Sequence, residues 1–292
     1  MTKSKITKTN IKMKNILAIL SLMLLIGCGS VDTSSTKRSL QEKVLKKGVI
    51  RAAYTIYYPG CFKDSTGKLK GVFVETLEKA AKDLDLKVEW VEEVGWATQI
   101  EGLNNDKYDM MGSSVWANPK RAKNATLSIP LYYSPLYVYT RANETKFDNI
   151  KNYEDLNSPR HIFSLVDGGT GEVIYKNMFS NAGKISLPQN TDFGTSFLDV
   201  KGKKADLVIM EPYQANKFSQ NNPNVIKSIL PKTPIKVFGN CYMFKKNEIE
   251  FQNMLNVVLT DLNNSGFIDK LLLKYEGVPN NFMRASKPFD TK

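Results

Sequence analysis

Residues 71–91 read GVFVETLEKAAKDLDLKVEWV, a helical pattern followed by a strand pattern. The apolar side chains of the first part recur every three or four residues, which predicts an amphipathic helix; they are Phe73, Leu77, Ala80, Ala81 and Leu84. Residues 49–54 precede this helix, residues 87–91 follow it, and both are short apolar runs that predict strands. The order strand, helix, strand predicts an α/β fold.

The same alternation returns in the second half of the chain. It predicts strands at residues 161–166 and 206–210 and helices at residues 171–179 and 191–200. Two extended runs, near residues 137–141 and 237–243, predict crossings between the halves. At about 150 residues per domain, 292 residues also favour two domains. We therefore expect two α/β lobes joined by a two-stranded hinge, with a cleft between them.

The composition excludes several functional classes. A hydrophobic content of 42% excludes a disordered chain, and one His with three Cys leaves too few ligands for a zinc or iron–sulfur module. We expect no metal and no cofactor. The net charge is +12, but five lysines and no acid lie in residues 1–27, so the remainder carries +7. That excess is scattered in short pairs, and no nucleic-acid partner is expected.

The amino terminus has the pattern of an export signal. Basic residues precede an apolar run at residues 16–27, which is too short for a transmembrane helix but suits a signal peptide. The run ends in Leu25-Ile26-Gly27-Cys28, which resembles the lipobox of bacterial lipoproteins. We expect cleavage before Cys28, lipidation of its sulfur with diacylglycerol and a palmitate-type acyl chain, and attachment of the exported protein to the membrane.

The patterns predict the following division of the chain. Residues 1–27 form the signal peptide, and the polar, Ser/Thr-rich residues 28–41 form a flexible tether. The first lobe is discontinuous and comprises residues 42–138 and 240–280, the second lobe comprises residues 139–239, and residues 281–292 form a C-terminal tail.

An ordered set of motifs makes the chain resemble a known family. The set consists of GVFVETL at residues 71–77, LSIPL at 127–131, GGTG at 168–171, KKADLVIMEP at 203–212 and LLLKYEG at 271–277. It is similar to the polar amino-acid family of bacterial solute-binding proteins, extracellular family 3. The resemblance implies a type II periplasmic-binding-protein-like fold and a monomeric, non-enzymatic receptor. Such a receptor delivers an amino acid or analogue to the permease of an ABC transporter, at the periplasmic face or outer surface of the cell membrane.

The resemblance also implies a ligand site. Arg121 stands where the family grips the ligand carboxylate, and a guanidinium fork matches two carboxylate oxygens. Glu211 stands where the family has an aspartate for the ligand ammonium, at the end of an apolar strand. Further expected ligand contacts come from hydroxyls, from a helix start that favours an anion, and from aromatic walls; these residues are Ser113, Ser114, Gly169, Thr170, Trp96, Tyr58 and Trp116.

Three departures from the family pattern bear on the ligand. Trp116 replaces a small hydroxyl residue, which removes a polar contact and fills volume, and Asn118 replaces a common threonine. Thr55 stands where binders of basic amino acids often place an acid, which weakens the case for lysine or arginine.

The sequence leaves open two other functions, an enzyme and a ligand sensor, and the pairing of two cysteines. Cyclohexadienyl dehydratases share this fold and resemble the chain in its Ser-Ile-Pro and Gly-Gly-Thr segments. Their general acid lies about one helical turn beyond the position of Glu211, where this chain has Gln214. A ligand sensor would make the same binding predictions as a transport receptor. Cys61 and Cys241 can form a disulfide in an exported protein or remain two buried thiols.

Overall fold

The structure is a computed structural model that describes residues 38–189, 191–287 and 289. The predicted signal peptide and residues 28–37 of the predicted tether, Cys28 included, lie outside the described residues. Within the described part of the chain, no helix combines the length and apolarity needed to cross a bilayer.

The first lobe is built on the predicted strand–helix–strand unit. Strand β1 (Val49–Tyr54) pairs in parallel with β4 (Lys87–Glu93) and β5 (Met110–Trp116). Between β1 and β4 the chain forms the short hairpin of β2 (Phe62–Lys63) and β3 (Leu69–Lys70) and then helix α3 (Val72–Asp83). The remaining helices of this lobe are α2 (Leu40–Lys47), α4 (Gln99–Asn104), α5 (Pro119–Asn124), α9 (Ile249–Asn264) and α10 (Phe267–Tyr275). Phe73 and Leu77 of α3 are fully buried in its core, as their spacing predicts.

The second lobe repeats the α/β pattern. Its strands β10 (Leu207–Met210), β8 (Ile162–Val166) and β9 (Gly183–Leu187) run parallel, and β11 (Ile226–Ser228) pairs with β7 (Tyr132–Arg141). The helices are α6 (Thr170–Met178), α7 (Gly194–Lys201) and α8 (Pro212–Asn221), with a short 3₁₀ turn η1 (Tyr153–Leu156). Two apolar clusters around Phe163 and Phe197 form its core.

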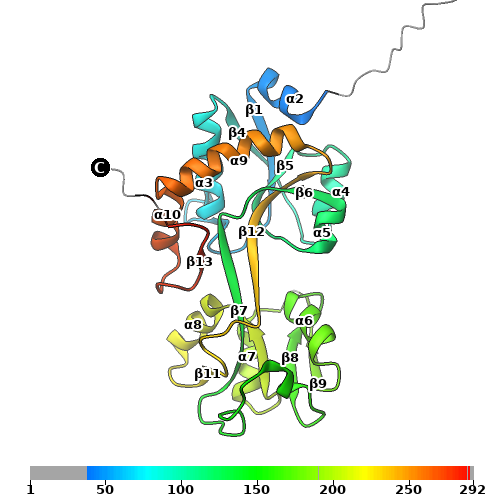
Figure 1. Ribbon diagram of the computed structural model, residues 1–292, viewed down its shortest axis with the longest axis vertical. Helices are drawn as coiled ribbons and strands as arrows, with labels where there is room; N and C mark the ends of the chain where they lie inside the picture. The colour runs from blue at the N-terminus through cyan, green and yellow to red at the C-terminus, as the bar shows by residue number, and fades with distance from the viewer. Residues whose placement is uncertain (1–37, 190, 288, 290–292) are drawn as a thin grey trace, which may run out of the picture. The chain divides into compact units, whose positions relative to one another are not determined.

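Two long antiparallel strands connect the lobes, as Figure 1 shows for β7 (Tyr132–Arg141) and β12 (Lys236–Lys245). They pair with each other from Tyr132 opposite Asn240 to Leu136 opposite Lys236. The strand order is β4-β1-β5-β12-β7-β10-β8-β9, with β6 (Ala125–Leu127) on β12 and β13 (Met283–Arg284) on β7. The expected fold of two α/β lobes joined by a two-stranded hinge is confirmed.

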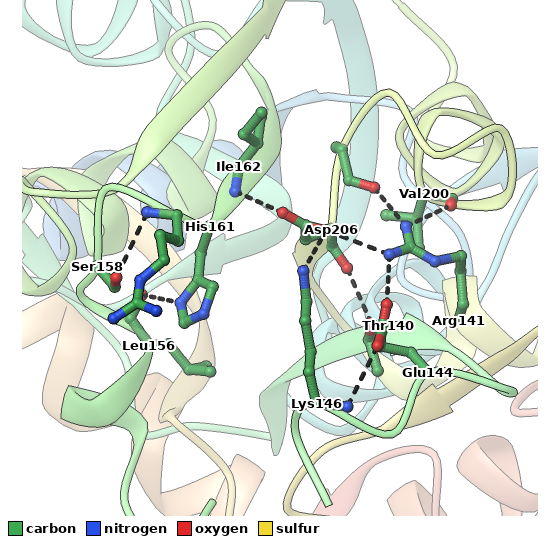
Figure 2. Close-up of polar contacts among 12 residues, drawn as sticks. Thr140, Arg141, Glu144, Lys146, Leu156, Ser158, His161, Ile162, Val200 and Asp206 are labelled. Carbon is green, nitrogen blue, oxygen red and sulfur yellow. Dashed lines mark hydrogen bonds and ion pairs between the residues drawn. The ribbon is translucent and has the colours of Figure 1, made fainter.

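A partly buried ionic cluster lies at the amino end of β10 in the second lobe (Figure 2). Asp206 accepts hydrogen bonds from Arg141, from Lys146 and from the backbone N–H of Ile162, at 2.6–3.2 Å. Arg141 also donates to the carbonyl oxygens of Val200 and Ala205. The donors come from β7, the loop after it and β8, and the carbonyl acceptors come from α7 and the turn after it, so the cluster ties these segments together at the amino end of β10.

The folded region extends beyond the predicted lobe boundaries at both ends. Helix α2 begins at Leu40, capped by the Ser39 hydroxyl, within the range predicted as tether. Phe282 is buried and β13 pairs with β7, although residues 281–292 were expected to be a tail. Apolar packing of Leu40 and Phe282 accounts for both differences, and the inner lobe boundaries stay a prediction.

Candidate functional site

Glu211 lies at the carboxyl end of β10, as its place after the apolar run Leu207–Met210 predicts. It is the residue preceding α8, and Pro212 occupies the first helical position, where a missing N–H does no harm. The Glu211 side chain is 2% exposed. Its Oε2 accepts a short hydrogen bond from the Tyr57 hydroxyl, while Oε1 has no hydrogen-bond partner among the described residues.

Burial dominates the electrostatics of Glu211. It raises the pKa of this carboxyl above its usual value, although the hydroxyls of Tyr57 and Ser134 act in the opposite direction. An unpaired buried oxygen of this kind is costly in the free protein, and a donor that reaches Oε1 would recover that free energy. The carboxylate therefore has the properties of a binding group for a cationic N–H donor.

Arg121 lies in α5, and the chain around it folds as the Asn-Pro signal predicts. Asn118 caps the helix by accepting the Arg121 backbone N–H at 2.9 Å, and Pro119 is the first helical residue. One guanidinium nitrogen, Nη1, donates to the carbonyl oxygen of Trp116 at 2.8 Å. The side chain is partly buried, its burial lowers its pKa, and no described carboxylate pairs with it. Its remaining N–H groups are left for an anion.

The start of α6 provides further backbone donors. Gly169 is the residue before the helix and Thr170 is its first residue, and no side chain caps them. The nearby Glu172 carboxylate accepts the Gly168 N–H and ion-pairs with Lys176 and Lys184, which holds the pKa of Glu172 at about 2. Because its charge is compensated by two lysines, Glu172 opposes an anion at this helix start less than a lone carboxylate would.

The residue that spans the two lobes is Tyr57, which the sequence patterns did not single out. Its ring meets Trp96 edge-to-face, with centroids 5.9 Å apart, and Phe193 of the second lobe at 6.4 Å. Trp96 is 48% exposed, as an aromatic wall open to a ligand would be. Tyr57, Trp96 and Phe193 therefore form an aromatic lining beside Glu211.

Tyr58, the expected wall, has a different place. Its hydroxyl donates to the carbonyl oxygen of Tyr275 at 2.7 Å, and its ring stacks on Tyr213 of α8 at 5.1 Å. Asn216 of α8 adds a 2.6 Å hydrogen bond to Asn281. Tyr58 thus belongs to a second contact between the lobes. Two consecutive tyrosines look alike in sequence, and only the backbone path decides which of them reaches Glu211.

The serines at the end of β5 are buried, and their hydroxyls bond within the protein. The Ser113 hydroxyl accepts the Thr55 backbone N–H at 2.9 Å, and the Ser114 hydroxyl donates to Asn240 of β12. The structure therefore gives both hydroxyls a role in joining β5 to its neighbours. Their expected contact with a ligand stays a prediction.

Trp116 packs where β5 meets the hinge. Its indole lies flat on Phe238 of β12, with centroids 5.0 Å apart and planes inclined by 4°. Its carbonyl oxygen is the acceptor that orients Arg121. Trp116 hence contributes to the hinge and to the placement of the guanidinium.

Cys61 and Cys241 are buried free thiols, so the disulfide alternative is not realised in this structure. Burial raises the pKa of both thiols to about 12. Among the described residues, no group of three His, Cys, Asp or Glu side chains could hold a metal ion.

Comparisons with known proteins identify the family of this chain. Residues 50–278 match the model of the bacterial extracellular solute-binding proteins, family 3. A probable amino-acid ABC transporter-binding protein of Haemophilus influenzae is 32% identical over 46% of this chain, and the match spans about half of that relative, 51%. A cyclohexadienyl dehydratase of Pseudomonas aeruginosa is 22% identical over 80% of this chain and 84% of its own.

A solved structure resembles the whole folded region. The crystal structure of AncCDT-1, an ancestral amino acid-binding protein described as a precursor of cyclohexadienyl dehydratase, superposes with a TM-score of 0.64. It is 25% identical, and the likeness covers 82% of this chain and 99% of that one.

Proposed function

Because this chain belongs to the bacterial extracellular solute-binding proteins of family 3, we propose that it captures a small amino-acid-like zwitterion between its lobes for an ABC importer. Arg121 binds the carboxylate of the ligand and Glu211 binds its ammonium. Thr170 and Gly169 add backbone donors, and Trp96 lies against the ligand side chain.

The observation that carries the proposal is the unpaired Oε1 of the buried Glu211 carboxylate. A buried polar atom without a partner is rare in folded proteins and points to a ligand that supplies one. Arg121 supports the same conclusion from the opposite charge, because its guanidinium is partly buried and, among the described residues, has only a carbonyl oxygen as acceptor. A zwitterion is the smallest ligand that satisfies both groups.

Replacement of Arg121 tests the proposal. Arg121→Met keeps the length of the side chain and removes the fork, so we expect the ligand-induced thermal shift to disappear while the ligand-free melting curve is retained. The probes are the twenty standard L-amino acids and L-cystine, tested one at a time. Lys123→Met is the matched control, since it removes the same charge from an exposed position of the same helix. An Arg121→Met protein that binds like the wild type contradicts the proposal.

The second candidate function is a cyclohexadienyl dehydratase, because one relative carries that name over most of the chain. The reaction needs a general acid to expel the leaving group. Gln214 lies one turn into α8 after Glu211, and its amide has no proton to give at that position. Incubation with prephenate and detection of the aromatic product separates the two functions, and we expect no product.

Export and lipid attachment at Cys28 are part of the proposal and rest on the sequence. We expect metabolically supplied labelled palmitate to be incorporated into the wild-type protein and not into Cys28→Ser, which should leave the membrane fraction. A sensing role differs from transport only in the protein that the closed form contacts. Crosslinking in membranes, with identification of a permease or of a signalling receptor, distinguishes these two roles.

A further inference from the structure

We propose that Tyr57 is the positioning residue that orients the Glu211 carboxylate across the lobes, so that the site accepts an ammonium bearing N–H groups and rejects a quaternary one. The inference rests on the proposed function and adds the chemical class of the cationic group. It also assigns a role to a side chain that comes from the lobe opposite Glu211.

The first support is the rigidity of Tyr57. Both backbone polar groups of Tyr57 bond to Cys61: its N–H donates to the Cys61 carbonyl at 2.8 Å, and its carbonyl accepts the Cys61 N–H at 3.0 Å. Its ring is held between Trp96 and Phe193. These contacts fix the position of the Tyr57 hydroxyl, which donates its hydrogen bond to Oε2 of Glu211.

The second support is the division of the two carboxylate oxygens. An ionised carboxylate only accepts hydrogen bonds. Tyr57 occupies Oε2 and leaves Oε1 without a partner in a position that is 2% exposed. A ligand with N–H groups satisfies Oε1 directly. A trimethylammonium group offers no donor, so Oε1 would stay buried and unpaired in the complex.

Contacts with the aromatic lining do not replace the hydrogen bond that a quaternary cation cannot donate to Oε1 of Glu211. Such cations are bound against the faces of aromatic rings. Tyr57 meets Trp96 at 78° and Phe193 at 89°, and in each of these contacts the edge of one ring covers a face of the other. Two ring faces are thus already occupied, and a quaternary cation on the exposed surface of Trp96 would still leave Oε1 of Glu211 without a donor among the described residues. Sites built around a hydrogen bond reject analogues that lack the donor strongly, and we expect discrimination of at least about 100-fold.

Tyr57 also acts on the ionisation of Glu211. Its hydrogen bond lowers the pKa of the carboxyl, against the larger effect of burial, and Ser134 acts in the same direction. Tyr132 and Tyr139 also face Glu211, and burial raises the pKa of both phenols, so they stay neutral over the physiological range. Without the Tyr57 hydroxyl, Glu211 stays protonated to a higher pH and loses its charge for the ligand ammonium.

The test compares Tyr57→Phe with Tyr58→Phe, its neighbour, whose hydroxyl bonds to Tyr275 instead. The probe is the L-amino acid that stabilises the wild type most among the twenty standard ones and L-cystine, together with its N,N,N-trimethyl derivative. Binding is measured by calorimetry from pH 5 to pH 9. For the wild type we expect at least about 100-fold weaker binding of the trimethyl derivative.

For Tyr57→Phe we expect about 10-fold to 100-fold weaker binding at pH 7, and loss of binding at a higher pH than in the wild type as the solution is acidified. Tyr58→Phe should keep the wild-type pH profile. Equal affinity for the two probes, or an unmoved pH profile in Tyr57→Phe, overturns the inference while the Arg121→Met result still supports the proposed function.

A wild type that binds no amino acid refutes the proposed function instead. The role of Tyr57 is then decided on the ligand-free protein by the pH dependence of its unfolding free energy. Loss of the hydroxyl should move the titration of Glu211 to higher pH in Tyr57→Phe only. Identical profiles of the wild type and Tyr57→Phe would overturn it.

Discussion

Replacing Glu211 by Gln should make the ligand-free protein more stable and weaken its binding of an ammonium. The change keeps the shape of the side chain and removes the charge that burial disfavours. A buried acceptor without a partner costs about 1–3 kcal/mol, and more when it is charged. We expect the free energy of unfolding at pH 8 to rise by about 2 kcal/mol. For a folded unit spanning residues 39–292, that corresponds to a melting temperature about 4–8 °C higher.

The stabilisation should depend on pH with a definite sign. Burial raises the pKa of Glu211 in the folded state above its unfolded value, so the folded wild type holds this proton longer than the unfolded chain. The contribution of Glu211 to the stability of the wild type is therefore lost as the pH rises from its pKa in the unfolded chain through its pKa in the folded protein. The advantage of Glu211→Gln is therefore largest at pH 8 and absent near pH 4, where Glu211 is protonated.

Urea unfolding from pH 4 to pH 8 and calorimetric binding of the best amino-acid probe measure both effects. We expect the affinity to fall by at least about 2 kcal/mol, roughly 30-fold, because the ligand ammonium loses its buried counter-charge. The reasoning would be refuted if Glu211→Gln were less stable than the wild type at pH 8, or if the difference in unfolding free energy between the two proteins were the same at pH 4 and pH 8.

Asp206 at the other end of β10 is the matched control. Burial alone would raise its pKa, but hydrogen bonds from Lys146, from the Ile162 N–H and from Arg141 bring it below the usual value. Asp206→Asn should therefore lower the stability at pH 7 by about 2 kcal/mol, with the loss fading as the pH falls. Binding of the amino-acid probe should be unchanged, since this cluster lies at the base of the lobe.

Three further predictions concern packing away from the Glu211 carboxylate. Tyr213→Ala removes the ring that stacks on Tyr58, and the ligand-free protein should show a larger radius of gyration in X-ray scattering; an unchanged radius would mean that this contact does not hold the lobes. Arg284→Ala leaves the buried carboxylate of Glu276 without its two guanidinium donors and should cost about 3 kcal/mol in urea unfolding, whereas a loss below about 1 kcal/mol would contradict a structural role for the pair. Cys61 and Cys241 should react with a thiol reagent only after denaturation, because burial raises the pKa of both to about 12, and rapid labelling of the native protein would disprove this.

Local patterns were sufficient for the fold. The helical spacing of Phe73 and Leu77 predicts α3, and both side chains are fully buried there. The Asn118-Pro119 signal predicts the start of α5, and the Asn118 side chain caps it. These features depend on residues that are close in sequence, so the chain around them contains the information.

The ends of the folded region were not predictable in the same way. Leu40 and Phe282 lie in polar stretches, and both are buried in the apolar cluster that contains Phe251 and Leu271. Leu40 shares only Val44 as a second buried position of its eight-residue helix, and Phe282 lies outside any helix, so neither stretch carries a long apolar period. The burial of each depends on a partner that the local sequence does not contain.

Sequence alone determined the chemical types at the candidate site: a guanidinium at Arg121, a carboxylate after an apolar strand at Glu211, and aromatic side chains at Tyr58 and Trp96. Tertiary structure alone decided that Tyr57 and not Tyr58 reaches Glu211, and that one oxygen of this carboxylate has no partner among the described residues. It also decided that the hydroxyls of Ser113 and Ser114 form hydrogen bonds within the protein. The reason is physical: hydrogen bonding and burial depend on distances between segments more than 100 residues apart, as in the Tyr57–Glu211 and Ser114–Asn240 pairs, and no local pattern encodes those distances.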